Sequence, residues 1–251
     1  MIALIVISTG PRYWPYINPL LDSAAKYLLP HYTFLFTDDP DLHPCEQVPV
    51  TAQGYPNETL HRYHTILEHE HVFDEYSHLF YIDVDALFVS PTGEEILSDG
   101  ITATLHAGYV TPSRFNQFRR GDWETRPASL AYVPPDTGKT YYCGGFNGGT
   151  REAYLEMARI IRGNINIDAK RDIVAKWHDE SHLNRYLAYK PPAKVLSPAY
   201  CYPEPQRFCR PDPMDVLRLI EAQRTAGMSE KDIWNQESFS PKIVCLEKRW
   251  R

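Results

Sequence analysis

The chain has 251 residues, and its 32 acidic and 26 basic side chains give a net charge of −6 at pH 7. This balance offers no basic field that could displace counterions from a nucleic acid, which excludes DNA and RNA as main partners. Hydrophobic residues form 43% and charged residues 23% of the sequence, as in a soluble protein with a sizeable core. The length fits one large α/β domain.

The five cysteines are widely spaced and include no C-x-x-C pair. We therefore expect neither a disulfide framework nor a structural zinc site. The apolar residues 1–8 follow no charged segment and are too few to span a bilayer, and no other apolar run reaches the ~20 residues of a membrane helix. The sequence predicts a soluble, cytoplasmic protein without a signal peptide or membrane anchor.

The first half of the chain alternates between strand and helix patterns, which predicts a doubly wound α/β sheet. Residues 2–7 (Ile-Ala-Leu-Ile-Val-Ile) are continuously apolar and indicate a buried parallel strand. Apolar residues at helix spacing follow, with a proline just beyond them. In chain order, the expected elements are strands at 2–7, 32–37 and 79–82, and helices at 17–29 and 60–73.

The second half of the chain is less regular. It has a loop-rich stretch at 111–140, and its expected helices are at 152–162, 181–189 and 214–224. Because there is no internal repeat, low-complexity segment or linker, we expect a single domain over 1–251. Basic residues concentrate at 248–251. They form either a solvated tail or a flap that closes over a diphosphate.

Asp83 and Asp85 directly follow the third expected strand, with Val84 between them. Alternate residues of an extended segment point the same way, so both carboxylates can approach one divalent cation. The alternative is a solvated turn with two surface acids. The apolar residues on both sides make it the weaker interpretation, because burying two carboxylates without a cation would be costly. The all-oxygen ligands favour Mn²⁺, with Mg²⁺ as the second candidate.

Two later segments are dense in functional residue types. Residues 141–150 hold four glycines and three aromatic rings, which indicates either a structural loop or a backbone that comes close to a ligand. Residues 177–184 (Trp-His-Asp-Glu-Ser-His-Leu-Asn) place titratable groups beside an indole, unless they only cap a surface helix. His178 and His182 have the spacing of a zinc-protease helix, but the glutamate between them is displaced by one place.

Five segments together resemble the histo-blood-group ABO family of α1,3-galactosyl- and N-acetylgalactosaminyltransferases. The two that carry most specificity are Trp-His-Asp-Glu-Ser-His-Leu-Asn and Lys-Val-Leu-Ser-Pro, and the match extends to about residue 205. The matching segments are 80–89, 106–109, 141–149, 177–184 and 194–198. Because the chain lacks the anchor and stem of the vertebrate enzymes, it looks like a short microbial or viral member.

This resemblance implies a GT-A-type α/β fold with a single doubly wound mixed sheet and helices on both faces. It implies retaining transfer of N-acetylgalactosamine or galactose from a UDP-sugar to a galactose-terminated acceptor glycan. Some bacterial relatives have Asn-x-Asn in place of the aspartates and are metal-independent, so Asp83 and Asp85 imply Mn²⁺ dependence. The implied halves are about 1–90 for the nucleotide and about 91–205 for the acceptor, followed by a C-terminal helix and flexible tail at about 206–251.

The resemblance also assigns residues to the donor. These are Ile7, Ser8 and Tyr13 around the uracil and ribose, Arg62 and Asp179 at the sugar, Asp83, Val84 and Asp85 in the metal-binding motif, and Cys143, Gly144 and Gly145 in the tripeptide that sets donor choice. Two glycines in that tripeptide leave room for an N-acetyl group. This favours UDP-GalNAc over UDP-Gal.

On the acceptor side, the resemblance points to His106, Asp122, Trp123, Trp177 and Glu180. His106 matches a histidine that contacts the acceptor galactose. Glu180 is the expected catalytic residue beneath the anomeric carbon, where it either attacks or stabilises an oxocarbenium ion. Either route retains the configuration of the sugar.

Two other classes of function stay open. One is a UDP-sugar-binding module without turnover, against which the complete set of Asp83, Asp85 and Glu180 argues. The other is a zinc metallohydrolase that uses His178 and His182 and needs no UDP.

Overall fold

The computed structural model describes residues 1–110, 121–204, 212–234 and 240–246. Its main feature is a seven-stranded mixed sheet with the order β3-β2-β1-β4-β7-β6-β8. Strands β1 to β4 are parallel where they pair, whereas β7 runs antiparallel to both of its neighbours, β4 and β6. The strands are β1 Ile2–Ser8, β2 His31–Thr37, β3 Glu46–Pro49, β4 His78–Asp83, β6 Ile101–Leu105, β7 Tyr142–Thr150 and β8 Lys194–Leu196.

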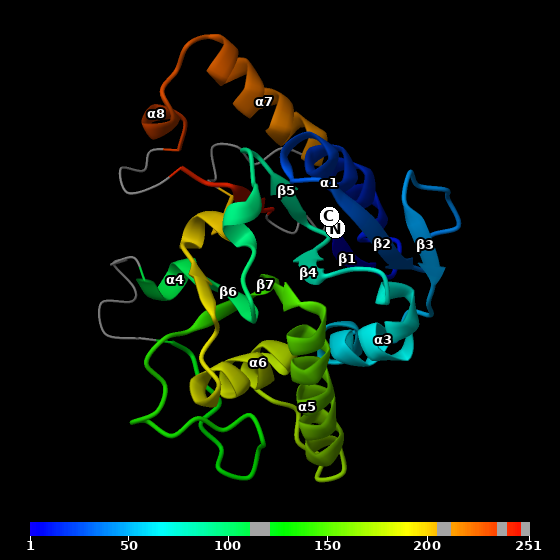
Figure 1. Cartoon of the computed structure of the whole chain (residues 1–251), viewed down its shortest axis with the longest axis vertical. Helices are drawn as coiled ribbons and strands as arrows, with labels where there is room; N and C mark the ends of the chain where they lie inside the picture. The colour runs from blue at the N-terminus through cyan, green and yellow to red at the C-terminus, as the bar shows by residue number, and fades with distance from the viewer. Residues whose placement is uncertain (111–120, 205–211, 235–239, 247–251) are drawn as a thin grey trace.

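Helices cover both faces of this sheet, as expected (Figure 1). One core contains α1 and α7, and the other contains α3, α5 and α6. The alternation along β1 explains the two cores, because Leu4 and Val6 pack on the first and Ala3 and Ile5 on the second. The helices are α1 Trp14–Tyr27, α2 Asn57–Leu60, α3 Arg62–Glu68, α4 Ala107–Val110, α5 Arg151–Ala169, α6 His178–Tyr189, α7 Pro213–Thr225 and α8 Glu230–Trp234.

A small second sheet joins the C-terminal part of the chain to the aspartate motif. Its order is β5-β10-β9, with β5 Ala86–Phe88, β9 Tyr202–Pro203 and β10 Ile243–Cys245. β5 begins directly after Asp85, and the backbone N–H of Leu246 donates to the Asp85 carbonyl at 2.7 Å. This hydrogen bond therefore ties the C-terminal segment to the backbone of the second aspartate. The basic segment at 248–251, for which a solvated tail or a flap was expected, lies outside the described residues.

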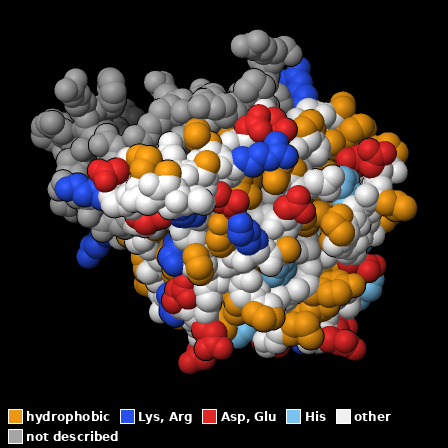
Figure 2. All heavy atoms as spheres, turned by 90° about the horizontal axis from the view of Figure 1, so that it is seen from above, with side chains coloured by type: hydrophobic (Ala, Val, Ile, Leu, Met, Phe, Trp, Pro, Cys, Tyr) orange, Lys and Arg blue, Asp and Glu red, His pale blue; other side chains and the backbone are white. Residues whose placement is uncertain are grey.

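On the face shown in Figure 2, acidic and basic side chains of the described residues are interspersed among hydrophobic ones. Within the described residues, no helix has the length and apolar character needed to cross a bilayer.

Most expected elements occur, but several elements of the structure differ from the sequence prediction. The expected helix at 60–73 is interrupted at His61 and His69, whose ψ angles of 16° and 21° lie far from the helical value. Strand β3 was not expected, because its sequence Glu-Gln-Val-Pro has little apolar character. Helix α5 runs to Ala169, beyond the expected end at 162.

The glycine-rich segment is an interior strand of the sheet, β7, which lies between β4 and β6. It forms no loop, although its pairing with β6 shifts register between Asn147 and Cys143, and it is buried along almost its whole length. A Cβ atom on Gly148 would lie 2.5 Å from the Leu79 carbonyl oxygen of β4, closer than any side chain can pack. Glycine is thus required at this position by the close approach of two strands.

Candidate active site

A cavity of ≈ 650 Å³ opens beyond the carboxyl ends of β1 and β4. This is the edge of a parallel sheet where ligands bind in doubly wound folds. The lining includes most of the expected donor residues, which are Ile7, Tyr13, Arg62, Asp83, Val84 and Asp85. Ser8 is buried behind them and does not line the cavity. Tyr55 also lines it, although the sequence did not single out this residue.

Asp83 is oriented by two donors that bind the same carboxylate oxygen. The Tyr81 hydroxyl donates to Oδ1 at 2.8 Å, and Arg62 Nη2 donates to Oδ1 at 3.1 Å. Tyr81 lies two residues before Asp83 on β4, so the strand alternation places both side chains on one face. Tyr81 was not among the expected site residues, although this i, i+2 spacing is a signal in the sequence that could have identified it.

Arg62 contacts residues from several elements of the site. Its guanidinium lies over the Tyr81 ring, with Cζ 3.9 Å from the ring centroid. Nη1 donates to the Gly144 carbonyl at 2.7 Å, and Nε lies 3.1 Å from Asp179 Oδ2. The buried guanidinium of Arg62 thus connects α3, β4, β7 and α6. Its positive charge offsets the charges of Asp83 and Asp179.

Asp179 is a buried acid with unused acceptor capacity. The side chain lies in the first turn of α6 and is 1% exposed. Among the described residues, neither of its oxygens has a well-aligned hydrogen-bond donor. Arg62 forms an ion pair with Oδ2, and the backbone N–H groups of Asp179 and Glu180 also act on the carboxylate. Burial raises the pKa of Asp179 to about 6, although Arg62 acts in the opposite direction. Buried acceptors without well-aligned donors indicate a place for ligand hydroxyl groups.

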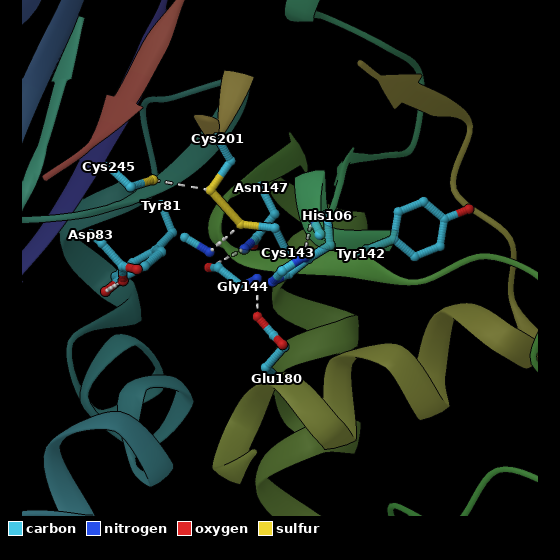
Figure 3. The surroundings of a disulfide bond; sticks show 12 residues. Tyr81, Asp83, His106, Tyr142, Cys143, Gly144, Asn147, Glu180, Cys201 and Cys245 are labelled. Carbon is cyan, nitrogen blue, oxygen red and sulfur yellow. Dashed lines mark hydrogen bonds between the residues drawn. A yellow bond between two sulfur atoms is a disulfide. The ribbon is translucent and has the colours of Figure 1, made fainter. Parts of the chain in front are cut away.

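Glu180 receives one hydrogen bond on each carboxylate oxygen. The Gly144 backbone N–H donates to Oε2 at 2.7 Å, and the Tyr141 hydroxyl donates to Oε1 at 2.9 Å. Burial raises the pKa of Glu180 to about 7, and these two hydrogen bonds oppose the rise. Figure 3 shows Glu180 reaching up from α6 to Gly144, with Asp83 on the other side of the same strand residue.

Asp83, an expected metal ligand, and Glu180 are therefore connected through one strand residue. Gly144 links them, because its carbonyl accepts from Arg62, which also holds Asp83, while its N–H donates to Glu180. Glu180 and Asp179 are adjacent on α6, and Asp85 lines the same cavity as Asp83. The arrangement can hold a charged leaving group on one side of a sugar and a carboxylate on the other.

Aromatic residues surround Tyr141 beside Glu180, and two of them, His106 and Trp123, are expected acceptor residues. Trp123, Tyr109 and His106 all contact the Tyr141 ring edge-on, at centroid distances of 5.0, 5.0 and 5.8 Å. Trp177 is 46% exposed, and its Nε1 donates to Asp122 Oδ2 at 2.8 Å. Exposed and half-buried rings beside polar groups suit the faces and hydroxyls of a saccharide.

A disulfide bond joins Cys143 of β7 to Cys201. From the sequence, we expected no disulfide framework and did not identify this single pair. A third sulfur, Cys245 Sγ, lies 3.2 Å from Cys201 Sγ (Figure 3). The pair was missed because 58 residues separate the two cysteines, and only the sheet brings them together. The bond ties the expected donor tripeptide to the segment after β8.

His178 and His182 have different surroundings and do not form a zinc site. His178 faces Tyr55, with ring centroids 5.3 Å apart, whereas His182 is buried and lies 3.7 Å from Asp168. Burial lowers the pKa of His182 to about 4. Among the described residues, no three His, Cys, Asp or Glu side chains are arranged to hold a metal. The geometry gives no support to the metallohydrolase alternative.

The mixed sheet with helices on both faces, and the aspartates at its ligand-binding edge, define a GT-A-like glycosyltransferase fold. The family model for glycosyltransferase family 6 matches residues 1–229, and the chain belongs to this family.

Similar proteins support the same assignment. The chain is 33% identical over 243 residues to the globoside alpha-1,3-N-acetylgalactosaminyltransferase 1 of Mus musculus, an alignment that covers 90% of this chain and 67% of the relative. It is 34% identical over 226 residues to the histo-blood group ABO system transferase 1 of Rattus norvegicus. This alignment covers 83% of this chain and 63% of the relative. The chain thus spans about two thirds of the length of these relatives.

Proposed function

We propose that the protein transfers N-acetylgalactosamine or galactose from a UDP-sugar to a glycan acceptor that ends in galactose, with retention of configuration. The observation that carries this proposal is the connection through Gly144, which joins the Asp83 side of the cavity to Glu180. The name of the mouse relative includes α1,3-N-acetylgalactosaminyl transfer. This name supports N-acetylgalactosamine as the transferred sugar and an α1,3 linkage in the product.

The side chains of Asp83 and Asp85 fit a hard divalent cation. Both border the cavity, and the two hydrogen bonds to Asp83 Oδ1 orient its carboxylate. Two protein carboxylates leave most of the coordination sphere to diphosphate oxygens and water, as Mn²⁺ and Mg²⁺ sites for nucleotides require. When bound, the cation would neutralise the charge of the leaving UDP.

Asp179 is proposed to bind the hydroxyl groups of the donor sugar. Its two buried oxygens lack well-aligned hydrogen-bond donors within the described residues, and sugar hydroxyls would supply them. Arg62 keeps this carboxylate ionised while it also holds Asp83. The two residues would therefore fix the sugar relative to the diphosphate.

Glu180 is proposed to face the anomeric carbon. Its carboxylate either attacks this carbon as UDP departs or stabilises an oxocarbenium ion while the acceptor hydroxyl approaches from the same face. The acceptor galactose would lie against His106 and Trp177, on the aromatic side of Glu180. Both routes require the ionised form of Glu180.

The donor tripeptide gives a prediction that separates the two functions of the site. A Cβ atom on Gly145 would lie 2.8 Å from Asp83 Oδ2, whereas one on Gly144 would lie 3.3 Å from Glu180 Oε2. We expect Gly145→Ala to raise the Mn²⁺ concentration for half-maximal rate by about tenfold, because the displaced Asp83 is a proposed metal ligand. Gly144→Ala is the matched variant, and we expect it to lower kcat with little change in Mn²⁺ dependence.

This pair is measured by titrating Mn²⁺ at saturating donor. Equal Mn²⁺ dependence in both variants would contradict the separate assignment of the two glycines. We also propose UDP-GalNAc as the preferred donor over UDP-Gal. This preference rests on the resemblance of the donor tripeptide alone, because Asp83, Cys201 and Glu180 lie where Cβ atoms at 144 and 145 would be.

The activity itself is tested by measuring UDP release. Wild-type protein is incubated with UDP-GalNAc, UDP-Gal or UDP-Glc, with and without Mn²⁺, and with a panel of galactosides and fucosylated galactosides. We expect acceptor-stimulated UDP release with Mn²⁺ and an α-linked product. UDP-sugar binding without release under all these conditions would favour a binding module instead.

A further inference from the structure

Tyr141 is a buried side chain that the proposed mechanism leaves without a role. It is 2% exposed, and its hydroxyl donates to Glu180 Oε1 at 2.9 Å. We infer that Tyr141 is a positioning residue, whose hydroxyl holds the Glu180 carboxylate in the orientation that transfer requires and links it to the acceptor pocket. This inference rests on the proposed function of Glu180.

The hydrogen-bond geometry explains why the second donor matters. The Gly144 N–H alone would fix Oε2 but would leave the carboxylate able to rotate, because the terminal torsion of glutamate is broad. With the Tyr141 hydroxyl on Oε1, both oxygens are held and the plane of the carboxylate is set. Hydrogen bonds to a charged group are the stronger class in proteins.

The backbone frame around Glu180 does not depend on the Tyr141 hydroxyl. The Asn184 side chain accepts from the Tyr142 N–H and donates to the Tyr142 carbonyl, each at 2.8 Å. It also donates to the Glu180 carbonyl at 3.0 Å. Because Asn184 fixes α6 against β7 in this way, removal of the Tyr141 hydroxyl should change the carboxylate and leave the frame intact.

The ring of Tyr141 is held by the acceptor side of the site. His106, Tyr109 and Trp123 contact it edge-on, and the His106 N–H donates to the Tyr141 carbonyl at 3.1 Å. A saccharide that packs on His106 and Trp123 therefore contacts residues that hold the Tyr141 ring. The hydroxyl of this ring donates to Glu180. Tyr141 thus connects His106 and Trp123, two of the expected acceptor residues, to the Glu180 carboxylate.

The charges around Glu180 predict the direction of the pH effect. Burial raises the pKa of Glu180, the Gly144 and Tyr141 hydrogen bonds lower it, Asp179 raises it and Arg62 lowers it. Burial and the Glu180 charge hold the pKa of Tyr141 well above its usual range, so the hydroxyl remains a donor at every working pH. Loss of this hydroxyl should therefore raise the pKa of Glu180 further.

The test compares Tyr141→Phe with Tyr142→Phe in the full-length chain with Mn²⁺. Figure 3 shows the Tyr142 ring directed away from Glu180, and this ring packs in the core beside α5 and α6. We expect Tyr141→Phe to lower kcat by about 10- to 100-fold, with the donor KM and UDP affinity nearly unchanged. The acid limb of kcat/KM, expected near pH 7, should move up by about one pH unit. Tyr142→Phe should change none of these.

A Tyr141→Phe variant with wild-type kcat and an unmoved acid limb would overturn the inference, and so would an equal effect of Tyr142→Phe. A second measurement does not depend on turnover. The protein is labelled with ¹³C at glutamate carboxyl groups, Glu180 is assigned from Glu180→Gln, and its titration is followed by NMR. We expect a higher midpoint in Tyr141→Phe only.

The two measurements separate the inference from the proposed function. Absence of transfer by the wild type together with a shifted Glu180 midpoint would contradict the function and retain the link between Tyr141 and Glu180. Normal transfer by Tyr141→Phe would contradict the link alone. If Tyr141→Phe does not fold, the wild type is labelled with ¹³C at tyrosine Cζ instead. One tyrosine resonance should then shift with pH at the midpoint of the Glu180 titration. This shift should disappear in Glu180→Gln, and its persistence there would overturn the inference.

Discussion

Glu180→Gln is expected to lower the rate of sugar transfer by about 10³-fold or more, while UDP binds with nearly wild-type affinity. Glutamine keeps the size of the side chain, and its amide oxygen can still accept a hydrogen bond from Gly144 or Tyr141. What it lacks is the negative charge opposite the anomeric carbon. The loss should therefore appear in kcat rather than in donor binding.

The measurement combines steady-state transfer with calorimetric titration of UDP and Mn²⁺. Glu156→Gln serves as the control, because Glu156 is an exposed residue of α5 that pairs with Lys190 on the surface. We expect this control to be indistinguishable from wild type. A Glu180→Gln variant that works at close to the wild-type rate would remove Glu180 from the chemistry.

Asp83→Asn is expected to abolish the Mn²⁺-dependent part of UDP binding. The variant keeps an oxygen for the hydrogen bonds from Tyr81 and Arg62, so the fold should be preserved, but the carboxylate charge that attracts the cation is lost. Because a bound cation contributes several kcal/mol to the stabilisation of a leaving diphosphate, we expect transfer to fall by at least about 10²-fold.

The decisive comparison is UDP affinity with and without Mn²⁺, measured by calorimetry in both proteins. Asp74→Asn is a suitable control, because Asp74 is an exposed acid that pairs only with Arg151 among the described residues. Equal UDP affinity with and without Mn²⁺ in the wild type would refute the metal assignment. So would an Asp83→Asn variant that retained the full enhancement.

Local patterns in the sequence were enough to predict β1, β2 and β4 of the seven-stranded sheet and the position of the aspartates. The apolar runs of β1, β2 and β4 specify buried strands without reference to the rest of the chain, and Asp83 follows directly from the end of β4. The resemblance added Arg62 and Glu180, and the structure places both beside Gly144.

The features that escaped prediction depend on contacts between distant segments. The glycines of β7 left open a structural loop or a backbone close to a ligand, because nothing in their own sequence reveals that β4 packs so closely against them. The partners of Tyr141 come from the segment before α4, from the loop at Trp123 and from α6, so no local pattern could identify it. The Cys143–Cys201 bond was hidden by the same separation in sequence.

The most direct test is a crystal structure of the protein with Mn²⁺ and UDP, in which anomalous scattering locates the metal. We expect one Mn²⁺ bound by Asp83 and Asp85 and by diphosphate oxygens, with Glu180 open to the space where the sugar would lie. An Mn²⁺ bound elsewhere, or UDP in the separate cavity between α1 and β3, would contradict the proposed donor site.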